Sequence, residues 1–234
     1  MKRFWEAAKA APTEGGFAIL LDGRPMRLPG GGALRVAEPA LAAAIAEEWQ
    51  AAGGAKGGTM RPDEVPLTRL AGTAAERIAP DPAGTITALA RYGETDLLCY
   101  RAEDRRLAAR QAAGWDPWLR WAAQDLDAPL MVTTGIMPVA QPASALAALR
   151  AAVARHAALH LAALGVAVPA LGSLVLGLAL AQGRLAPAEA LRLSVLEEDF
   201  QAEFWGADAD ATARRDSAVA DVALAGRLFA LLRG

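Results

Sequence analysis

The sequence predicts an α+β fold, in which a small N-terminal β-rich α+β domain precedes a larger, mainly helical domain of the orthogonal-bundle type. Strand and turn signals are concentrated in residues 17–37, and the sequence after Pro66 has almost only helical patterns. With 234 residues, 54% of them hydrophobic and 21% charged, the chain can bury a sizeable core. We therefore expect two domains, residues 1–66 and 67–234.

A β-hairpin is predicted near the start of the chain. Phe17–Leu21 and Arg24–Leu28 flank the turn pair Asp22-Gly23, which is typical of a two-residue hairpin loop. Leu34–Val36 is a further short extended segment. A helix is expected to begin at Pro39, because proline is favoured at the first helical position.

The second part of the chain is expected to be helical. Glycine and proline are expected to break the third of its helices near Gly114 and Pro117, and Leu130–Thr134 is a short strand or an extended connector. The predicted helices are Leu67–Ile78, Ala83–Tyr92, Ala102–Leu126, Ala143–Leu164, Pro169–Gln182, Pro187–Trp205 and Asp210–Leu232.

One uncharged stretch is long enough to span a bilayer. Leu161–Ala181 contains no Asp, Glu, Lys or Arg, and a membrane span needs about 20 such residues. However, Gly165, Pro169 and Gly172 interrupt it, and Val168 precedes a proline and is therefore expected to leave helical geometry. We interpret the stretch as buried core helices, and we expect no membrane insertion.

Charge and cysteine content exclude several classes of protein. The net charge is −2 and the pI is about 5.8, so no basic field would attract nucleic acid. The single cysteine, Cys99, cannot form an intramolecular disulfide. The N-terminus has no apolar core of signal-peptide length, so we expect a cytoplasmic protein.

No cofactor, metal or small-molecule substrate is expected. The glycine-rich residues 53–59 lack the order of a phosphate-binding loop. His156 and His160 are four residues apart and could share one helix face, but no third ligand completes a metal site. No serine stands in a Gly-x-Ser-x-Gly elbow, and Cys99 between Leu98 and Tyr100 is interpreted as a small packed side chain.

Carboxylates are unusually dense in the predicted helix Pro187–Trp205. At 100° per residue, Asp199 and Glu203 lie on one solvated stripe, whereas Glu197 and Glu198 fall among apolar residues. A charge in such surroundings is costly unless it is paired. The glutamates could pair internally with Arg91 or Arg101, or wait for a partner protein at the edge of an apolar docking surface.

A third interpretation is enzymatic. Glu197, Glu198 and Asp96 could serve as acid and base in a pocket of the helical domain, although paired carboxylates are a weak catalytic signal. We keep such an acid/base enzyme as the alternative to a binding protein.

The segment Tyr92–Arg101 carries a second group of chemically distinctive residues. Glu94 and Asp96 flank Thr95, and either Thr95 or Asp96 could cap the following turn. The tyrosines at its ends could anchor it by ring burial and hydroxyl bonds. Three tryptophans between residues 115 and 121 are expected to pack in the core, although tryptophans near a groove also make binding hot spots.

These motifs, in this order, resemble the ATP synthase assembly chaperones of the ATP-twelve family, in the form found in alphaproteobacteria. The resemblance covers nearly the whole chain. Its pieces are Phe4-Trp5, Leu21–Pro25, Met60-Arg61-Pro62 with Val65-Pro66-Leu67, Tyr92–Arg101, Trp115–Trp121, and Leu196–Gln201 with Trp205-Gly206.

The resemblance implies a chaperone without enzymatic activity that binds the unassembled alpha subunit of the catalytic head and shields its beta-facing surface. It also implies a cytoplasmic location in bacteria, and the mitochondrial matrix for the eukaryotic relatives. Many relatives have His-Asp where this chain has Arg215-Asp216, so a role for that histidine does not carry over. The implied partner-binding residues are Glu197 and Glu198 first, then Gln201, Trp205, Gly206, Asp96 and Tyr92.

Overall fold

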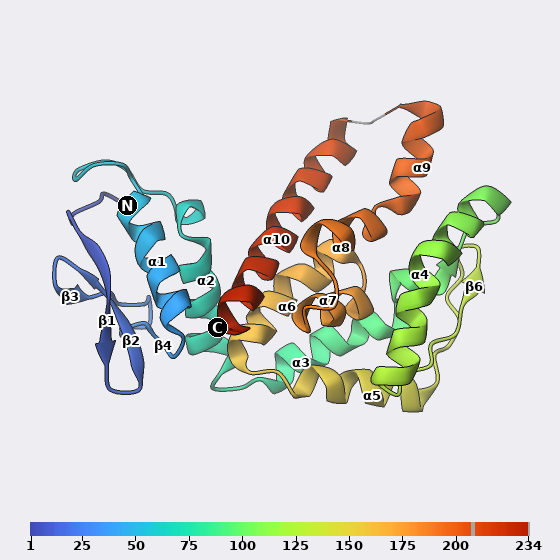
Figure 1. Cartoon of the computed structure of the whole chain (residues 1–234), viewed down its shortest axis with the longest axis horizontal. Helices are drawn as coiled ribbons and strands as arrows, with labels where there is room; N and C mark the ends of the chain where they lie inside the picture. Colours follow the sequence, from blue (N-terminus) through green and yellow to red (C-terminus); the bar gives the residue numbers. More distant parts are fainter. Residues whose placement is uncertain (207–208, 234) are drawn as a thin grey trace. The chain divides into compact units, whose positions relative to one another are not determined.

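The structure, a computed structural model, describes residues 1–206 and 209–233, without the side chains of residues 205 and 209–212 (Figure 1). Its contacts divide the chain into two compact units. Unit 1 contains Met1–Pro82 and the C-terminal residues from Arg227, and unit 2 contains Ala83–Gly226. The predicted α+β class is confirmed, with the strands β1–β4 and two of the helices in the N-terminal unit. The division after Pro82 groups residues 67–82 with the strands, although the expected boundary followed residue 66.

A four-stranded antiparallel sheet forms one layer of the N-terminal unit. Its strands are β1 (Ala8–Thr13), β2 (Gly16–Leu21), β3 (Arg24–Pro25) and β4 (Arg35–Val36). β2 is central and pairs with the other three, with Ala8 opposite Leu21 and Leu21 opposite Arg24. The turn between β2 and β3 has φ values of 48° at Asp22 and 79° at Gly23, which confirms the predicted hairpin.

β1 was not predicted. Its sequence, Ala-Lys-Ala-Ala-Pro-Thr, is poor in the β-branched and aromatic residues that mark strands. It is an edge strand, where Pro12 can be accommodated without the loss of a ladder hydrogen bond. β1 is therefore extended because it pairs with β2, and its own sequence does not favour a strand.

The helices α1 (Pro39–Ala51) and α2 (Pro66–Thr73) form the second layer of this unit, and α2 continues into a π-helical turn, Ala74–Ile78. Leu41, Ile45 and Trp49 of α1 are buried. A remote residue caps α2, because the buried carboxylate of Glu48 accepts hydrogen bonds from the backbone N–H groups of Leu67 (2.8 Å) and Thr68 (3.2 Å).

Buried Arg3 connects separate backbone segments of the N-terminal unit by hydrogen bonds. The residue is 3% exposed, and its guanidinium donates hydrogen bonds to the backbone carbonyls of Trp5 (3.1 Å), Gln50 (2.8 Å) and Ala52 (3.2 Å), and also to that of Gly54. These carbonyls belong to the N-terminal segment, the last turn of α1 and the loop after it, and a single side chain with five N–H donors satisfies them together.

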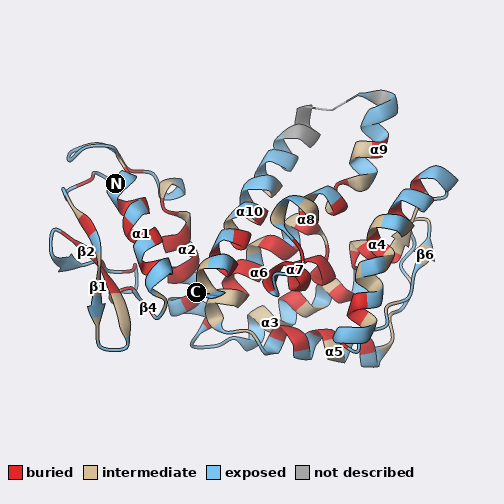
Figure 2. Ribbon diagram, in the orientation of Figure 1, coloured by how far each residue is buried: buried red, intermediate tan, exposed pale blue. Residues whose placement is uncertain are grey.

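The second unit is built around α7 (Leu174–Ala181), in which every residue is buried (Figure 2). A helix that is apolar on all sides belongs in a core. α7 contacts α6, α4 and α8. The helices of this unit are α3 (Ala83–Ala90), α4 (Arg105–Asp125), α5 (Ala143–Ala154), α6 (Ala158–Leu171), α7, α8 (Pro187–Ser194), α9 (Leu196–Trp205) and α10 (Ala209–Arg233), the last of which extends into the residues of the other unit. β5 (Tyr100–Arg101) pairs in parallel with β6 (Thr133–Thr134).

The uncharged stretch lies in the core, as predicted, but its boundaries differ. Val168 and Pro169 lie within α6, whose break comes later, at Gly172 (φ 62°). Pro169 is in the last turn, and the exposed Gly165 four residues earlier leaves the unpaired carbonyl open to water. Ser173 then caps α7 by accepting a hydrogen bond from Leu176 N–H (3.1 Å). Within the described part of the chain, no helix is both long and apolar enough to cross a membrane.

The predicted break in the third helix is also wrong, because α4 runs unbroken through Gly114 and Pro117. Ala113, whose carbonyl loses its partner to the proline, is exposed and can bond water. Gly114 has a packing reason, since a Cβ atom there would lie 3.0 Å from Leu193 and 3.3 Å from Leu196. The small residue lets α4 approach α8 and α9.

We expect Arg3→Met to destabilise the protein by about 2 kcal/mol or more, because it leaves several buried carbonyls without donors. Chemical denaturation followed by tryptophan fluorescence would measure the change, since Trp5 and Trp49 lie in this unit. Arg24→Met, at an exposed arginine of β3, is the matched control. Equal stability of the two variants would contradict the role of Arg3 as the donor to these buried carbonyls.

Candidate functional site

The segment Tyr92–Arg101 is fastened to the start of α7 by a buried carboxylate. Asp96 has no exposed surface, and its two oxygens accept hydrogen bonds from Leu98 N–H and Val175 N–H, each 3.1 Å long. The backbone N–H of Leu97 donates to the carbonyl of Gly172 (3.1 Å). The prediction that Asp96 could cap the following turn is confirmed.

This burial limits what Asp96 can do for a partner. A side chain with no exposed surface cannot contact another protein in this conformation, so Asp96 can influence a binding surface only by positioning the elements around it. Burial raises the pKa of its carboxyl group, and the hydrogen bonds from Val175, Ser173 and Leu98 oppose that rise. Tyr92 is half-buried.

Arg101 and Trp115 connect this segment to α4 and α8. The Arg101 guanidinium donates to the carbonyls of Leu98 and Tyr100 (2.7 Å each), pairs with Asp116, and lies 5.4 Å from the centroid of the Trp115 ring. Trp115 is fully buried, as expected for a core tryptophan. Arg101 is thus engaged within the core and does not pair with Glu197 or Glu198.

Trp115 also explains why the predicted helix Pro187–Trp205 is two helices. Its indole N–H donates to the carbonyl of Leu193 (2.9 Å), the group that would accept the N–H of Glu197 in a continuous helix. The chain turns at Val195 (φ −100°, ψ 12°) and continues as α9. A helical wheel drawn through the turn therefore assigns wrong faces to the residues that follow it.

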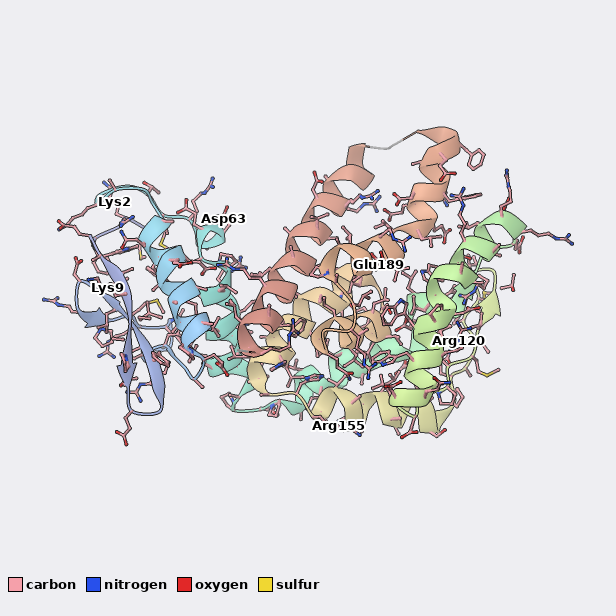
Figure 3. All side chains as sticks on the ribbon, viewed as in Figure 1. Lys2, Lys9, Asp63, Arg120, Arg155 and Glu189 are labelled. Carbon is pink, nitrogen blue, oxygen red and sulfur yellow. The ribbon has the colours of Figure 1, made fainter. Side chains whose placement is uncertain are left out.

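One side of α9 is held against α4 by ions and rings. Arg110 makes a two-pronged contact with Glu203 (2.6 and 3.0 Å), and this contact lowers the pKa of the Glu203 carboxyl group. The Arg110 guanidinium also lies 5.0 Å from the centroid of Phe200, and that of Arg106 lies 5.2 Å from the centroid of Phe204. Sticks from α4 and α9 face each other in Figure 3.

The other side of α9 carries the predicted glutamates at the surface. Glu197, Glu198 and Gln201 are exposed, so the expectation that the glutamates lie amid apolar neighbours is wrong, because of the turn at Val195. Glu197 accepts a long hydrogen bond from Gln201 (3.4 Å), and Glu198 has no hydrogen bond or ion pair with any residue that the structure describes. By contrast, Asp199 pairs with Arg215.

The end of α9 completes this surface. Gly206, with a φ of 78°, terminates the helix, and its N–H donates to the carbonyl of Ala202 (3.0 Å). The side chain of Trp205 lies outside the described residues. Phe204 is 51% exposed. We call Glu197, Glu198, Gln201 and Phe204 the α9 surface: two carboxylates and an amide beside a half-exposed ring that also contacts Arg106 of α4.

The acid/base arrangement of the alternative hypothesis does not form. Asp96 is buried at the start of α7, whereas Glu197 and Glu198 stand on the exposed side of α9, so the three carboxylates do not share an accessible pocket. The remaining reactive candidates are packed groups. Burial raises the pKa of the Cys99 thiol to about 12 and lowers that of His156, which stacks on His160. Among the described residues no group of three His, Cys, Asp or Glu could hold a metal ion.

The helical unit has a second exposed feature that was not predicted. Leu130–Thr134 was expected only as a strand or connector, and residues 135–137 were not assigned. Four large apolar side chains near β6 are exposed: Met131 (51%), Val132 (44%), Ile136 (92%) and Met137 (73%). Their clustering over seven residues without helical or strand periodicity was the available signal. Exposed apolar side chains that gather in this way mark a candidate interaction surface.

Comparison with known proteins places these features in a family. A family model described as ATP12 chaperone protein matches residues 2–123. The crystal structure of Atp12 from Paracoccus denitrificans is 44% identical over 98% of this chain and 97% of that one, with a TM-score of 0.92. An aspartate-to-lysine variant of the same Paracoccus protein matches equally well. The Agrobacterium tumefaciens protein Atu1473 is 38% identical over 99% of this chain and 86% of that one, with a TM-score of 0.90.

The buried carboxyl group of Asp96 should make stability depend on pH. Because its pKa is raised in the folded state, the folded protein binds more protons than the unfolded one above about pH 4, and the contribution of Asp96 to stability falls as the pH rises through the raised value. We therefore expect Asp96→Asn to cost more stability at pH 5 than at pH 8. Urea denaturation of both proteins across this range measures the difference.

Glu94→Gln, at an exposed acid of the same segment, is the control and should show no such trend. A cost of Asp96→Asn that grows with pH would mean that the hydrogen bonds outweigh burial and keep the folded carboxylate ionised.

Proposed function

The chain belongs to the ATP12 chaperone family, and from this premise we propose that it holds the unassembled alpha subunit of the ATP synthase catalytic head until the beta subunit arrives. A free alpha subunit exposes the apolar surface that beta will cover, and such a surface is prone to aggregation. A chaperone that covers it reversibly keeps the subunit competent for assembly.

The α9 surface supports this proposal more directly than any other feature. Glu198 stands exposed without a partner among the described residues, while the neighbouring Asp199 and Glu203 are engaged by Arg215 and Arg110. An exposed charge costs little to maintain in water and becomes useful when a partner supplies an arginine or a backbone N–H. We infer that Glu198, with Glu197 and Gln201, contacts the alpha subunit.

The apolar residues supply the other part of the contact. Phe204 extends the α9 surface with a half-exposed ring, and the apolar group around Ile136 offers a second area in the same unit. Aromatic and methionine side chains are enriched in the centres of protein interfaces, and charges at their rim guide association more than they add affinity. A shielding surface of this composition suits an apolar subunit interface.

The proposed function gives different roles to the remaining predicted residues, which are Asp96, Tyr92, Trp205 and Gly206. Asp96 positions the start of α7 and so acts through the helices that pack on it. Gly206 ends α9 and sets the length of the helix that presents the glutamates. We keep Tyr92 and Trp205 as candidate contacts.

Release fits an exchange mechanism, in which beta competes for the covered surface of alpha. The contact must then be weaker than the assembled alpha–beta interface, which is consistent with a surface built from a few exposed carboxylates and rings. We infer that the complex is of moderate affinity and that added beta subunit dissolves it.

The test is reconstitution of the purified chain with purified alpha and beta subunits. We expect capture of alpha without stoichiometric beta, and release of alpha when beta is added. If the folded chain does not bind the alpha subunit, the proposed function is wrong.

Glu198→Lys should weaken alpha binding at least tenfold, about 1.4 kcal/mol, because it places a like charge against the cation that the wild-type carboxylate meets. Surface-immobilised alpha subunit and a dilution series of chaperone give the dissociation constant. Glu47→Lys, an equally exposed glutamate on α1, is the matched control and should bind as the wild type does. If the two variants bind alike, α9 is not the docking surface.

A further inference from the structure

The N-terminal unit contains a groove that is lined by none of the partner-binding residues implied by the resemblance and by no residue of the α9 surface. It has a volume of about 630 Å³ and is formed between the segment 26–29, the segment 60–62 and the outer side of α2. This volume is within the range of peptide and ligand sites. All of its lining residues belong to the N-terminal unit, so the groove is a property of that unit alone.

The floor of the groove is apolar and includes two methionines. Met26, Leu28, Trp49, Met60 and Val65 line it, and each is less than one-tenth exposed. Trp49 is fixed, because its indole N–H donates to the hydroxyl of Thr68 (2.9 Å). Methionine is unbranched and polarisable, so it adapts to apolar side chains of different shape. The floor therefore suits insertion of varied aliphatic or aromatic side chains.

The rim of the groove is strongly basic. Four arginines line it, Arg27, Arg61, Arg69 and Arg77, against a single acid, Glu76. The Glu76 carboxylate is already used, because it accepts the backbone N–H of Gly30 (2.8 Å). The rim is thus positive although the whole chain has a net charge of −2.

Two of these four arginines, Arg27 and Arg61, already have partners within the unit, and the other two, Arg69 and Arg77, are available for a client. Arg27 donates to the carbonyl of Gly31 (2.7 Å), and Arg61 lies 3.5 Å from Asp63 on the turn labelled in Figure 3. Arg69 and Arg77 are exposed and make no ion pair with any residue in the described part of the chain. They are eight residues apart along α2 and its π-helical continuation, so their Cα atoms are separated by at most about 12 Å along the helix axis.

We propose that this groove binds a polypeptide segment of the client in which apolar side chains are flanked by acidic residues. The apolar side chains would occupy the methionine floor, and the two flanking carboxylates would meet Arg69 and Arg77. Guanidinium groups bind carboxylates with two parallel hydrogen bonds, which gives such a contact direction as well as strength. The identity of the segment's owner, the alpha subunit, rests on the proposed function.

A peptide fits the observations better than a small amphipathic acid. A peptide brings apolar side chains and at least two carboxylates together, so it can cover the floor and meet both Arg69 and Arg77, whereas a small amphipathic acid brings one carboxylate. A fatty acid is the competing occupant and serves as a separate arm of the test.

The experiment uses the full chain and a fluorescein-labelled peptide of about ten residues, Glu-Asp-Ser-Leu-Leu-Phe-Leu-Ser-Asp-Glu. We expect fluorescence anisotropy to show saturable binding, weakened at least tenfold in the double variant Arg69→Glu, Arg77→Glu. A version with lysine in place of every acid should bind at least tenfold more weakly than the acidic one. The control is Arg24→Glu, Arg35→Glu, which reverses two exposed arginines of the same unit outside the groove and should bind as the wild type does.

No binding of the acidic peptide, or equal binding by both double variants, overturns the groove assignment. Binding of dodecanoate without the peptide overturns it as well and assigns the groove to a small acid. The same variants titrated with the alpha subunit separate this proposal from the proposed function. If Glu198→Lys weakens binding of the alpha subunit and the double groove variant does not, the groove takes no part in client binding. If the chain binds the peptide but not the alpha subunit, the groove is a peptide site and the alpha subunit is not its client.

Discussion

The helical unit depends on how the carboxylate of Asp96 satisfies two backbone segments at once. It accepts hydrogen bonds from the turn at Leu98 and from the first turn of α7 at Val175, 79 residues away in sequence. α7 is buried on all sides, and its free N–H groups at the N-terminus would be costly without an acceptor. The other helices of the unit pack around α7, whose start is set by Asp96 together with the N-cap residue Ser173.

α4 and α8 connect the buried helix α7 to α9 at the surface. α7 contacts α4 and α8, Trp115 of α4 bonds the last turn of α8, and Arg110 of α4 clamps Glu203 of α9. The first link is packing between helices, and the other two are polar contacts. Together they hold one side of α9 and leave Glu197 and Glu198 exposed on the other.

A chaperone that holds a subunit until exchange has to bind an apolar surface without aggregating through its own. The α9 surface combines carboxylates with a half-exposed ring, and the N-terminal groove combines an apolar floor with an arginine rim. In both places charge surrounds the apolar area, which preserves solubility and restricts the partners that fit. The two surfaces carry opposite charge, so under the proposed function they would meet different segments of a client.

The sequence by itself determined the class of the fold, the hairpin at Asp22-Gly23, the approximate helices and the motifs that identify the family. These features depend on local pattern and on turn chemistry, which neighbouring residues encode. Tertiary structure decided which residues face outward on α9, because the bond from Trp115 to Leu193 turns the chain at Val195 and rotates every later side chain. It also decided that Asp96 is buried and that arginines from separate segments surround one groove, since contacts between residues distant in sequence leave no local periodicity to detect.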